Sequence, residues 1–388
     1  MNPGDDPKIL VVNPGSTSTR VALFLGGVVD ESVTLPAPAS GSPVGLWDQF
    51  PARLQGIRGW MEGEGIRGEE LSAVVGRGGL LRPLEGGTYF VNEAMLADAR
   101  GNRRGTHASN LGCALAQALA DHATRAAAEA RLPADGDNGA ASEPGKAPFQ
   151  PAGPPRVPAF IVDPVSVDEF EDLARISGLR GVERISLSHA LSIHALVQEV
   201  CRGERRPLEG SRFVVAHLGG GISVCPVSSG RIIDANNANS GGPFSPTRAG
   251  GLPTQELIDL CFSGDHTVSD LREMTVKRGG LVSYLGTDDA RTVEERIEAG
   301  DHEAMMVFEA MAYQIAKEIG AMATVLEGSV DKVLLTGGLA SSGLLVKWVR
   351  DRVSFIGPVE VWPEVGEMRA LALGALGVLR GELQAKEY

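Results

Sequence analysis

The sequence predicts an α/β protein that consists of two duplicated domains. Short runs of β-branched residues alternate with helical patterns of apolar residues, which is typical of α/β architecture. The segments 9–25 and 213–234 also resemble each other, because each has an apolar strand, a turn that contains glycine and a second strand. A chain of 388 residues exceeds what a single hydrophobic core usually contains. We therefore expect a duplicated domain rather than one extended sheet.

The individual elements follow from the same patterns. Strands are predicted where β-branched and other apolar residues form short runs, at 9–13, 20–25, 73–75, 159–163, 213–217, 223–226, 231–234 and 332–336. Helices are predicted where apolar residues recur at helical spacing, at 110–131, 187–201, 254–262, 301–326 and 368–384. The segment 301–326 carries apolar residues nearly all round, so we expect it to cross the core of the second domain or a dimer interface.

The net charge of −13 limits the classes of partner that the protein can bind. A nucleic-acid backbone or an anionic membrane would be repelled on average, although a local basic pocket for a small anion stays open. The four cysteines lie far apart without a CxxC pair, so we expect reduced thiols rather than disulfides or a zinc site. The sequence starts without a signal-peptide pattern, and no apolar run reaches the length of a membrane span, about 18 residues. These features predict a cytoplasmic enzyme without nucleic-acid or membrane partners.

Residues 131–158 interrupt the alternation of strands and helices. This segment is rich in Pro, Gly and Ala and has almost no large side chain to bury. We interpret it as a flexible surface insertion. A lid over a ligand is the alternative, but a lid usually carries a polar anchor for that ligand.

Three turns carry residue types that suit an anion. The first follows the strand 9–13 and reads NPGSTST, in which Gly15 lets the backbone approach a ligand and the Ser and Thr residues add hydroxyl and amide donors. Converging donors of this kind suit a phosphate or a carboxylate. A plain hairpin turn is the alternative, and the segment is not a Walker loop because no GK[ST] follows.

The other two turns are rich in glycine. HLGGGISV at 217–224 has three consecutive glycines after a buried strand, so no side chain separates the backbone from a ligand. VLLTGGLASS at 333–342 is a strand that ends in Thr-Gly-Gly before a helix start, which favours an anion or a nucleotide. A tight hairpin and an ordinary strand-to-helix turn are the respective alternatives. Each motif alone is weak, and the three in this order are much more specific.

In this order the motifs resemble those of the acetate and sugar kinase, hsp70 and actin superfamily, and within it the acetokinase family. Similar blocks extend over the chain apart from the insertion: NPGSTSTR, VGRGGLLRPLEGGTYFVNEAML, THASNLG, FIVDPVSVDEFEDLARISG, FVVAHLGGGISV, GPFSPTRAGGLP, LIDLCFSG, GGLVSYLGT, AYQIAKEIGAMATVL and LLTGGLA. The resemblance implies two actin-like (ribonuclease H-like) domains with a nucleotide cleft between them. Residues 1–165 and 366–388 would form the N-terminal domain, and residues 166–365 the C-terminal, nucleotide-binding domain.

The family also implies an activity and its ligands. A short-chain carboxylic acid would attack the γ-phosphate of ATP in line and reversibly form an acyl phosphate and ADP, with Mg²⁺ as cofactor. The chain would form a homodimer or a larger homo-oligomer. The blocks VGRGGLLRPLEGGTYFVNEAM and HASNLG favour butyrate or a branched short-chain acid over acetate. One methylene changes binding by only about 1–3 kcal/mol, so an acetate or propionate kinase is the nearest alternative.

The family's functional residues can be carried over to the matching positions of this sequence. The implied catalytic residues are Arg77, His107, Asp163, His189 and Arg248. The implied nucleotide-binding residues are Asn13, Ser16, Ser18, His217, Gly219, Gly220, Gly221, Gly337 and Gly338. The implied Mg²⁺ ligands are Asn13 and Glu367. Arg77 is the least direct match, since it either replaces the family's arginine or lies beside its place.

The residue types agree with this chemistry. Two arginines offer planar forks for a carboxylate and a phosphoryl group, and a histidine can donate a hydrogen bond to a transferring phosphoryl group. Without the resemblance, Asp163 would be a strand-end cap, His107 a surface histidine and Arg248 part of a domain-closing salt bridge. His189 and His194 are five residues apart, off a common helix face, and make a poor metal pair.

Two other functions stay open. A non-catalytic, actin-like ATP-binding protein would hydrolyse ATP slowly and without acid dependence, and the two arginines argue against it. A sugar kinase would need a base aspartate beside polar side chains that contact hydroxyl groups, and the block LLRPLEGG is too apolar for that.

Overall fold

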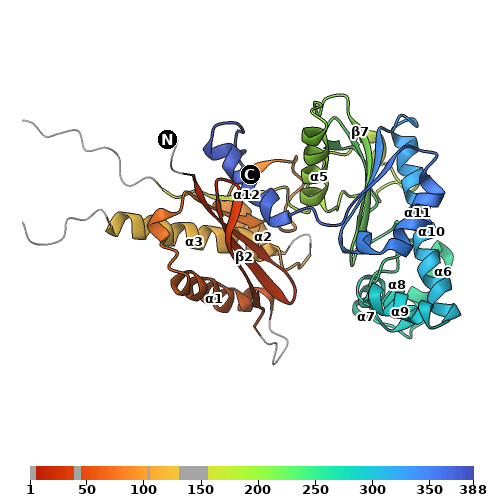
Figure 1. Ribbon diagram of the computed structural model, residues 1–388. Coiled ribbons are helices and arrows are strands. Elements are labelled where there is room, and N and C mark those ends of the chain that lie inside the picture. Colours follow the sequence, from red (N-terminus) through yellow and green to blue (C-terminus); the bar gives the residue numbers. More distant parts are fainter. Residues whose placement is uncertain (1–5, 39–44, 103–104, 131–155) are drawn as a thin grey trace, which may run out of the picture. The chain divides into compact units, whose positions relative to one another are not determined.

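The computed structural model describes residues 6–38, 45–102, 105–130 and 156–388 (Figure 1). The chain forms two compact units. Unit 1 comprises Met1–Arg82, Gly87–Val162 and Leu371–Tyr388, and unit 2 comprises Pro83–Gly86 and Asp163–Ala370. The insertion predicted at 131–158 lies, apart from its last three residues, outside the described residues. Within the described ranges, no helix is long and apolar enough to cross a bilayer.

Unit 1 is built around a six-stranded sheet in the order β3-β2-β1-β4-β6-β5. The strands are β1 (Lys8–Pro14), β2 (Ser18–Leu25), β3 (Val28–Pro36), β4 (Ala73–Arg77), β5 (Thr88–Phe90) and β6 (Ala159–Val162). The first three are antiparallel neighbours, and β4 and β6 run parallel to β1. β5 closes the far edge as an antiparallel strand beside β6.

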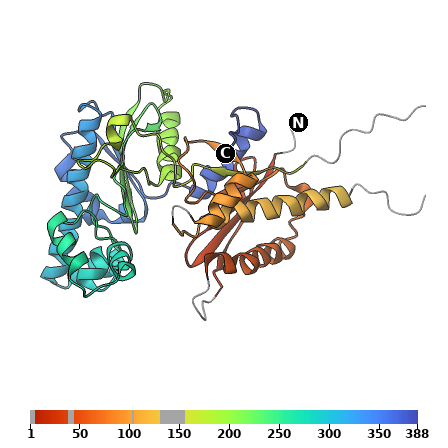
Figure 2. The same cartoon turned by 180° about the vertical axis from the view of Figure 1, so that it is seen from behind.

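Helices cover both faces of this sheet. α1 (Phe50–Gly63) and α3 (Asn110–Glu129) lie side by side on one face, where Leu10, Val12 and Val74 point into their shared core (Figure 2). The part of α12 (Glu367–Leu379) that belongs to unit 1 packs on the other face, where Gly374 lies against the Val162 side chain. α2 (Glu93–Gly101) packs against α3.

Unit 2 repeats this architecture with the order β11-β10-β7-β8-β9. The strands are β7 (Arg212–Leu218), β8 (Ile222–Ser228), β9 (Arg231–Ile232), β10 (Lys332–Thr336) and β11 (Val359–Trp362). Read from the other edge, three antiparallel strands precede two parallel ones, as in the order β3-β2-β1-β4-β6 of unit 1. The shared strand order confirms the predicted duplicated α/β fold.

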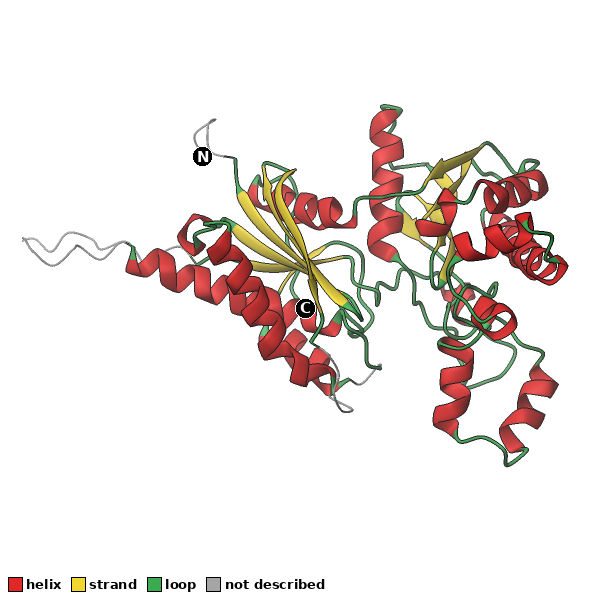
Figure 3. Cartoon of the chain, turned by 60° about the horizontal axis from the view of Figure 1, so that its bottom comes forward, coloured by secondary structure: helices red, strands yellow, loops and turns green. Residues whose placement is uncertain are grey.

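The helices of unit 2 also divide between two faces, and Figure 3 shows helices on both sides of the yellow strands. α5 (Ala190–Gly203) packs on one face through Ile193 and Val197, together with Phe213 and Val215 of β7. α10 (His302–Val325) and α11 (Gly343–Val353) cover the other. The shorter helices are α4 (Asp172–Arg175), α6 (Thr254–Phe262), α7 (Val268–Val276), α8 (Gly280–Leu285) and α9 (Ala290–Glu298).

α10 crosses the core of unit 2, as predicted, and exposes Met306 and Tyr313 on its other face. Other predicted elements need correction. The strand predicted at 231–234 is only Arg231–Ile232. The helix predicted at 368–384 ends at Leu379, because the chain turns at Gly381 with φ of 72°. β3 was not predicted, since most of its residues are exposed and no apolar run marks it.

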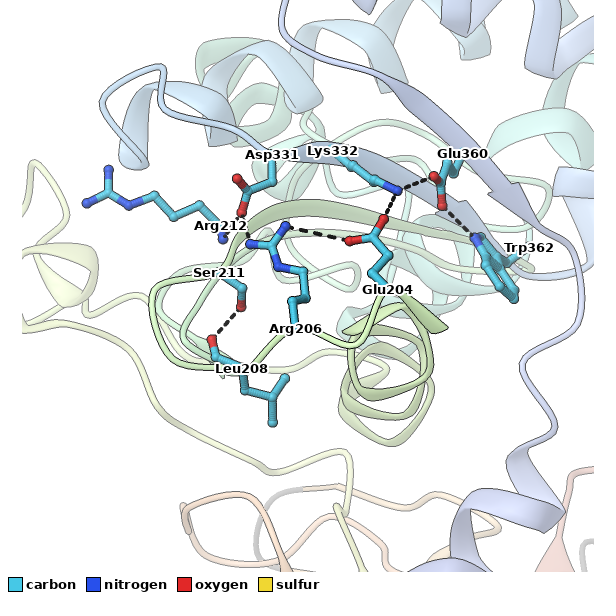
Figure 4. A network of polar contacts seen from close by, with 9 residues as sticks. All are labelled: Glu204, Arg206, Leu208, Ser211, Arg212, Asp331, Lys332, Glu360 and Trp362. Carbon is cyan, nitrogen blue, oxygen red and sulfur yellow. Dashed lines mark hydrogen bonds and ion pairs between the residues drawn. The ribbon is translucent and has the colours of Figure 1, made fainter. Parts of the chain in front are cut away.

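A network of ion pairs fastens the end of α5 to the amino ends of β7 and β10 (Figure 4). Arg206 Nη2 lies 2.6 Å from Asp331 Oδ2, which also accepts a hydrogen bond of 2.8 Å from the Arg212 backbone N–H. Lys332 pairs with both Glu204 and Glu360. The network is at the opposite edge of the sheet from the carboxyl ends of the strands, so it leaves that edge available for a ligand.

In unit 1, α3 and β4 approach each other so closely that one added methyl group should lower the stability of the fold. A Cβ at Gly112 of α3 would lie 2.0 Å from the Arg77 carbonyl oxygen, and one at Gly76 would lie 2.2 Å from the Gly112 carbonyl oxygen. We expect Gly112→Ala to lower the free energy of unfolding by about 2 kcal/mol or more, because backbone has to move. Gly59→Ala on α1 is the control: its Cβ has nothing within 4 Å, so it should be neutral or stabilise by about 0.5–1 kcal/mol. Urea unfolding of both variants measures the difference, and equal stabilities would contradict the packing argument.

Candidate functional site

The carboxyl ends of three neighbouring strands of unit 1 each carry, or directly precede in the chain, a predicted site residue. Val12 is in register with Gly76, so Asn13 of β1 and Arg77 of β4 are adjacent at the carboxyl ends of their strands. Arg77 is in register with Val162, the last residue of β6, and Asp163 follows it directly in the chain. Ligands of open α/β sheets bind at the carboxyl ends of the strands.

The turn between β1 and β2 is the predicted phosphate hairpin. The backbone N–H of Gly15 donates to the Ser18 carbonyl oxygen at 2.8 Å, which closes a tight turn. The side chains of Ser16 and Thr17 are exposed, that of Ser18 is half-buried, and Asn13 is buried. The hydroxyl groups of Ser16 and Thr17 are therefore exposed to solvent, while the backbone of the turn is held by its own hydrogen bond.

His107 is exposed and lies just before α3. Its Nδ1 accepts a hydrogen bond of 3.2 Å from the Ser109 backbone N–H and is 2.6 Å from Ser109 Oγ. Because Nδ1 is an acceptor, a neutral His107 ring carries its proton on Nε2. That tautomer makes Nε2 a hydrogen-bond donor.

Asn110, which was not predicted as a site residue, joins the segments that carry Arg77 and His107. Its side chain is fully buried; Oδ1 accepts from the Leu80 backbone N–H at 2.8 Å, and Nδ2 donates to the Gly105 carbonyl oxygen at 3.1 Å. A buried amide that uses both ends in this way holds its partners firmly. The available signal was an Asn at a helix start between two Gly-containing segments.

In unit 2, residues at the start of α5 contact three predicted site residues, namely His217, Glu367 and Asp163. His189 precedes the helix, and its ring stacks on that of His217 with centroids 3.9 Å apart and planes inclined by 13°. Its Nδ1 is 2.9 Å from Ser223 Oγ of β8. Ser192 donates a hydrogen bond of 3.0 Å to Glu367 Oε1.

The third contact of α5 is made by His194, which the sequence analysis set aside. The buried ring lies between two carboxylates: Nδ1 is 3.1 Å from Asp163 Oδ1, and Nε2 is 3.3 Å from Glu169 Oε2. Burial alone would lower the pKa of His194, but the two carboxylates outweigh it and raise the pKa to about 10. The ring is therefore an imidazolium at neutral pH and holds Asp163 in place.

Glu169 and Asp163 carry further constraints. The Glu169 carboxylate accepts hydrogen bonds from the backbone N–H groups of Gly86 at 3.0 Å and Ile232 at 2.8 Å. Burial raises the pKa of Glu169, but His194 and these two bonds outweigh it and hold the pKa below its usual value. Asp163 adopts a φ of 40°, a backbone conformation that costs a non-glycine residue energy.

The Gly-rich turn between β7 and β8 is packed under Arg248. A Cβ at Gly221 would lie 2.5 Å from the Arg248 guanidinium carbon, so only glycine admits the guanidinium there. The Gly220 carbonyl oxygen accepts hydrogen bonds from Ser245 Oγ at 2.5 Å and Thr247 Oγ1 at 3.0 Å, which ties the segment before Arg248 to the turn. Among the described residues, no carboxylate pairs with Arg248, and burial lowers the pKa of its guanidinium.

The third predicted turn meets the second. Gly337 follows β10 with φ of 89°, and a Cβ there would lie 2.4 Å from the Leu218 carbonyl oxygen. Thr336 and His217 are in register, so both glycine turns stand at the carboxyl ends of adjacent parallel strands. The structure thus brings Gly219–Gly221 and Gly337–Gly338 together in unit 2.

The predicted residues form two sets, one in each unit. Unit 1 holds Asn13, Ser16, Ser18, Arg77 and His107. Unit 2 holds Asp163, His189, His217, Gly219, Gly220, Gly221, Arg248, Gly337, Gly338 and Glu367. The described residues contain no cluster of three His, Cys, Asp or Glu side chains that could hold a metal ion. The predicted ligands Asn13 and Glu367 carry oxygen atoms, the type of ligand that Mg²⁺ takes together with phosphate oxygens and water.

Comparison with known proteins identifies the family. Over 98% of its length, the chain is 45% identical to "Probable butyrate kinase 2" of Caldanaerobacter subterraneus subsp. tengcongensis, of which it covers 99%. The chain belongs to the acetokinase family. The sequence model of this family matches residues 180–362.

Solved acetokinase-like structures share the fold. The chain is similar to Porphyromonas gingivalis acetate kinase, with a TM-score of 0.72 and 18% identity over 96% of this chain and 100% of that one. It is also similar to a propionate kinase from Francisella tularensis subsp. tularensis SCHU S4, with a TM-score of 0.69 and 16% identity over 95% and 98% of the two chains. At these identities the likeness shows the fold alone, and it confirms the predicted actin-like architecture.

The His194 bridge predicts a pH-dependent stability. The pKa of His194 is about 10 in the folded protein, against about 6.5 in an unfolded chain, so the bridge stabilises the fold fully below pH 6.5 and loses this effect as the pH rises through 10. We expect the difference in free energy of unfolding between the wild type and His194→Gln to shrink over this window, by at most about 1.4 kcal/mol per pH unit. Urea unfolding at a series of pH values measures it.

His122→Gln on α3 is the control for this series. Burial lowers the pKa of His122, so its contribution to stability has the opposite sign and is absent above pH 6.5. A wild-type to His194→Gln difference that stays constant from pH 6 to pH 10 would contradict an imidazolium at this position.

Proposed function

We propose that this chain is a butyrate kinase, which reversibly transfers the γ-phosphoryl group of ATP to butyrate or a branched short-chain acid. The observation that carries the proposal is the half-buried Arg248, which lies on a glycine turn without a carboxylate partner among the described residues. A cation kept without a counter-ion in this place suits a transferring phosphoryl group. The 45% identity to a probable butyrate kinase supports the choice of acid.

The chemistry requires no covalent intermediate on the protein. An oxygen of the acid's carboxylate attacks the γ-phosphorus and forms the new P–O bond, while the bond to the bridging oxygen of ADP breaks and its electron pair stays on ADP. No proton has to be transferred, because the attacking group is already a carboxylate. The products are the acyl phosphate and ADP, and catalysis consists of positioning and charge neutralisation.

The side chains of the two units divide these tasks. In unit 2, Arg248 neutralises charge on the phosphoryl group. His189 donates a hydrogen bond to the same group, and its ring is held in place by stacking on His217. Asp163, held by His194, orients the reacting groups. In unit 1, Arg77 binds the acid's carboxylate and His107 donates to it from Nε2.

The nucleotide would be held by the turns. The donors of Ser16 and Ser18 and the backbone of Gly219–Gly221 bind phosphates, and Gly337–Gly338 lies on the adenosine side. Asn13 and Glu367 would hold Mg²⁺ through oxygen atoms, and the ion, when bound with ATP, neutralises phosphate charge. The Glu367 carboxylate is already oriented by Ser192 at 3.0 Å.

We also infer a homodimer or larger homo-oligomer in the cytoplasm. α6 and α7 bury none of their residues within the chain, and Ile258, Phe262 and Val268 are exposed there, which supports a self-association surface. The four cysteines are free thiols, which supports a reducing compartment.

An acid panel tests the proposed reaction. We expect purified protein with ATP and Mg²⁺ to form acyl phosphate, trapped as the hydroxamate with hydroxylamine, faster with butyrate and isobutyrate than with acetate. A preference for acetate or propionate would make the chain an acetate or propionate kinase. ATP hydrolysis that no C2 to C5 acid alters would sink the kinase proposal and favour a non-catalytic ATP-binding protein.

Arg248→Ala tests the role of the unpaired guanidinium. We expect kcat to fall by about 100-fold or more, with the dissociation constant of ATP changed much less, because the charge acts mainly on the transferring group. Arg278→Ala, at an exposed arginine that pairs only with Glu273 among the described residues, is the control and should retain activity. If Arg248→Ala unfolds or loses ATP binding altogether, Arg248 has a structural role instead.

A further inference from the structure

Beneath the turn between β1 and β2 lies an arginine to which neither the sequence analysis nor the proposed mechanism gives a role. Arg53 is in the first turns of α1 and is only 4% exposed. Its guanidinium donates to the Gly15 carbonyl oxygen at 3.0 Å, the Ser18 carbonyl oxygen at 3.1 Å and Thr19 Oγ1 at 2.7 Å. The two remaining N–H groups donate to Gln49 Oε1 at 2.9 and 3.2 Å.

All five N–H groups of Arg53 are therefore used, and every acceptor is neutral. In the described part of the chain, no carboxylate lies within ion-pair distance of the guanidinium. A buried charge without a counter-ion is costly, and a cation near the start of a helix is unfavourable for the helix dipole as well. Sequences break such rules chiefly at functional sites.

The contacts also decide which way the turn faces. In a trans peptide, the C=O of one residue and the N–H of the next point in opposite directions. The Gly15 carbonyl points at Arg53, so the Ser16 N–H points away from it. Among the described residues, the backbone N–H groups of Ser16 and Thr17 have no hydrogen-bond partner, and both residues are exposed. The turn thus presents amide donors outward above a buried positive charge.

We propose that Arg53 is a positioning residue, which orients the backbone of the Gly15–Thr19 turn and gives the turn a positive potential that favours the phosphates of ATP. The inference rests on the proposed function only in that this turn binds nucleotide phosphate. Arg53 touches the turn and not the ligand: it turns carbonyl groups inward, leaves amide groups outward and supplies an uncompensated positive potential. This combination favours an anion over a neutral ligand.

Gln49→Glu separates the charge of Arg53 from its geometry. The substituted carboxylate can accept the same two hydrogen bonds and neutralises the guanidinium in place. We expect thermal stability to stay equal or rise, while the dissociation constant of ATP increases about tenfold, as for a unit charge about 12 Å from a phosphate at an effective dielectric constant of about 20. The dissociation constant of adenosine, which has no phosphates, should not change. In turnover, KM for ATP should rise and KM for the acid should not.

Two substitutions of Arg53 and one control complete the experiment. Arg53→Gln should weaken ATP binding more than Gln49→Glu does. Arg53→Lys should bind ATP more tightly than Arg53→Gln but less tightly than the wild type, because lysine keeps the charge and cannot form the same fork. Arg58→Gln, on the same helix and without a contact to the turn, should bind ATP as the wild type does. If Arg53→Gln fails to fold, Gln49→Glu decides alone.

The outcomes distinguish this inference from the proposed function. ATP affinity of Gln49→Glu within twofold of the wild type, or an equal loss for ATP and adenosine, overturns the role of Arg53. A wild type that binds ATP but forms no acyl phosphate overturns the kinase proposal and leaves the ATP comparison fully informative.

Discussion

The buried imidazolium of His194 is the interaction on which the site of unit 2 depends. One ring holds the strained Asp163 on one side and Glu169 on the other, and Glu169 in turn fixes the backbone of Gly86 and Ile232. Removing one partner of such a bridge leaves a charge buried without compensation, so its members depend strongly on one another. The bridge thereby fixes the position of the start of α5, where His189 and Ser192 lie.

Glycine supplies the second constraint, through the close approach of backbone to its neighbours. Gly112 lets α3 lie on β4, Gly337 lets one turn lie on another, and Gly221 admits the guanidinium of Arg248. At each of these positions a methyl group would occupy space that a backbone or a functional group already fills. The result is a site whose donors are placed before a ligand arrives, which is the arrangement that favours transfer of a charged group.

Sequence reasoning predicted the parts of the site that are local in the chain. The three turns, the strands before them and the duplication of the domain follow from runs of apolar residues and glycines. His194, Arg53 and Asn110 were not predicted, because their roles come from partners that are distant in sequence: Arg53 reaches across 38 positions to Gly15, and Asn110 across 30 positions to Leu80. A buried polar residue on a helix has the same local sequence pattern whether it supports a site or only packs in a core. Tertiary contacts are needed to distinguish the two cases.

The division of the chain into units has a consequence for how the protein is made. Unit 1 needs residues 371–388, whose Lys386 pairs with the backbone of Thr88 and whose Tyr388 hydroxyl donates to Asp98 at 2.9 Å. These residues leave the ribosome after the whole of unit 2. The strands β1–β6 must therefore wait, with the α12 face of their sheet open to chaperones and to aggregation, until α12 has been synthesised. Unit 2, nearly contiguous in the chain, can finish folding first.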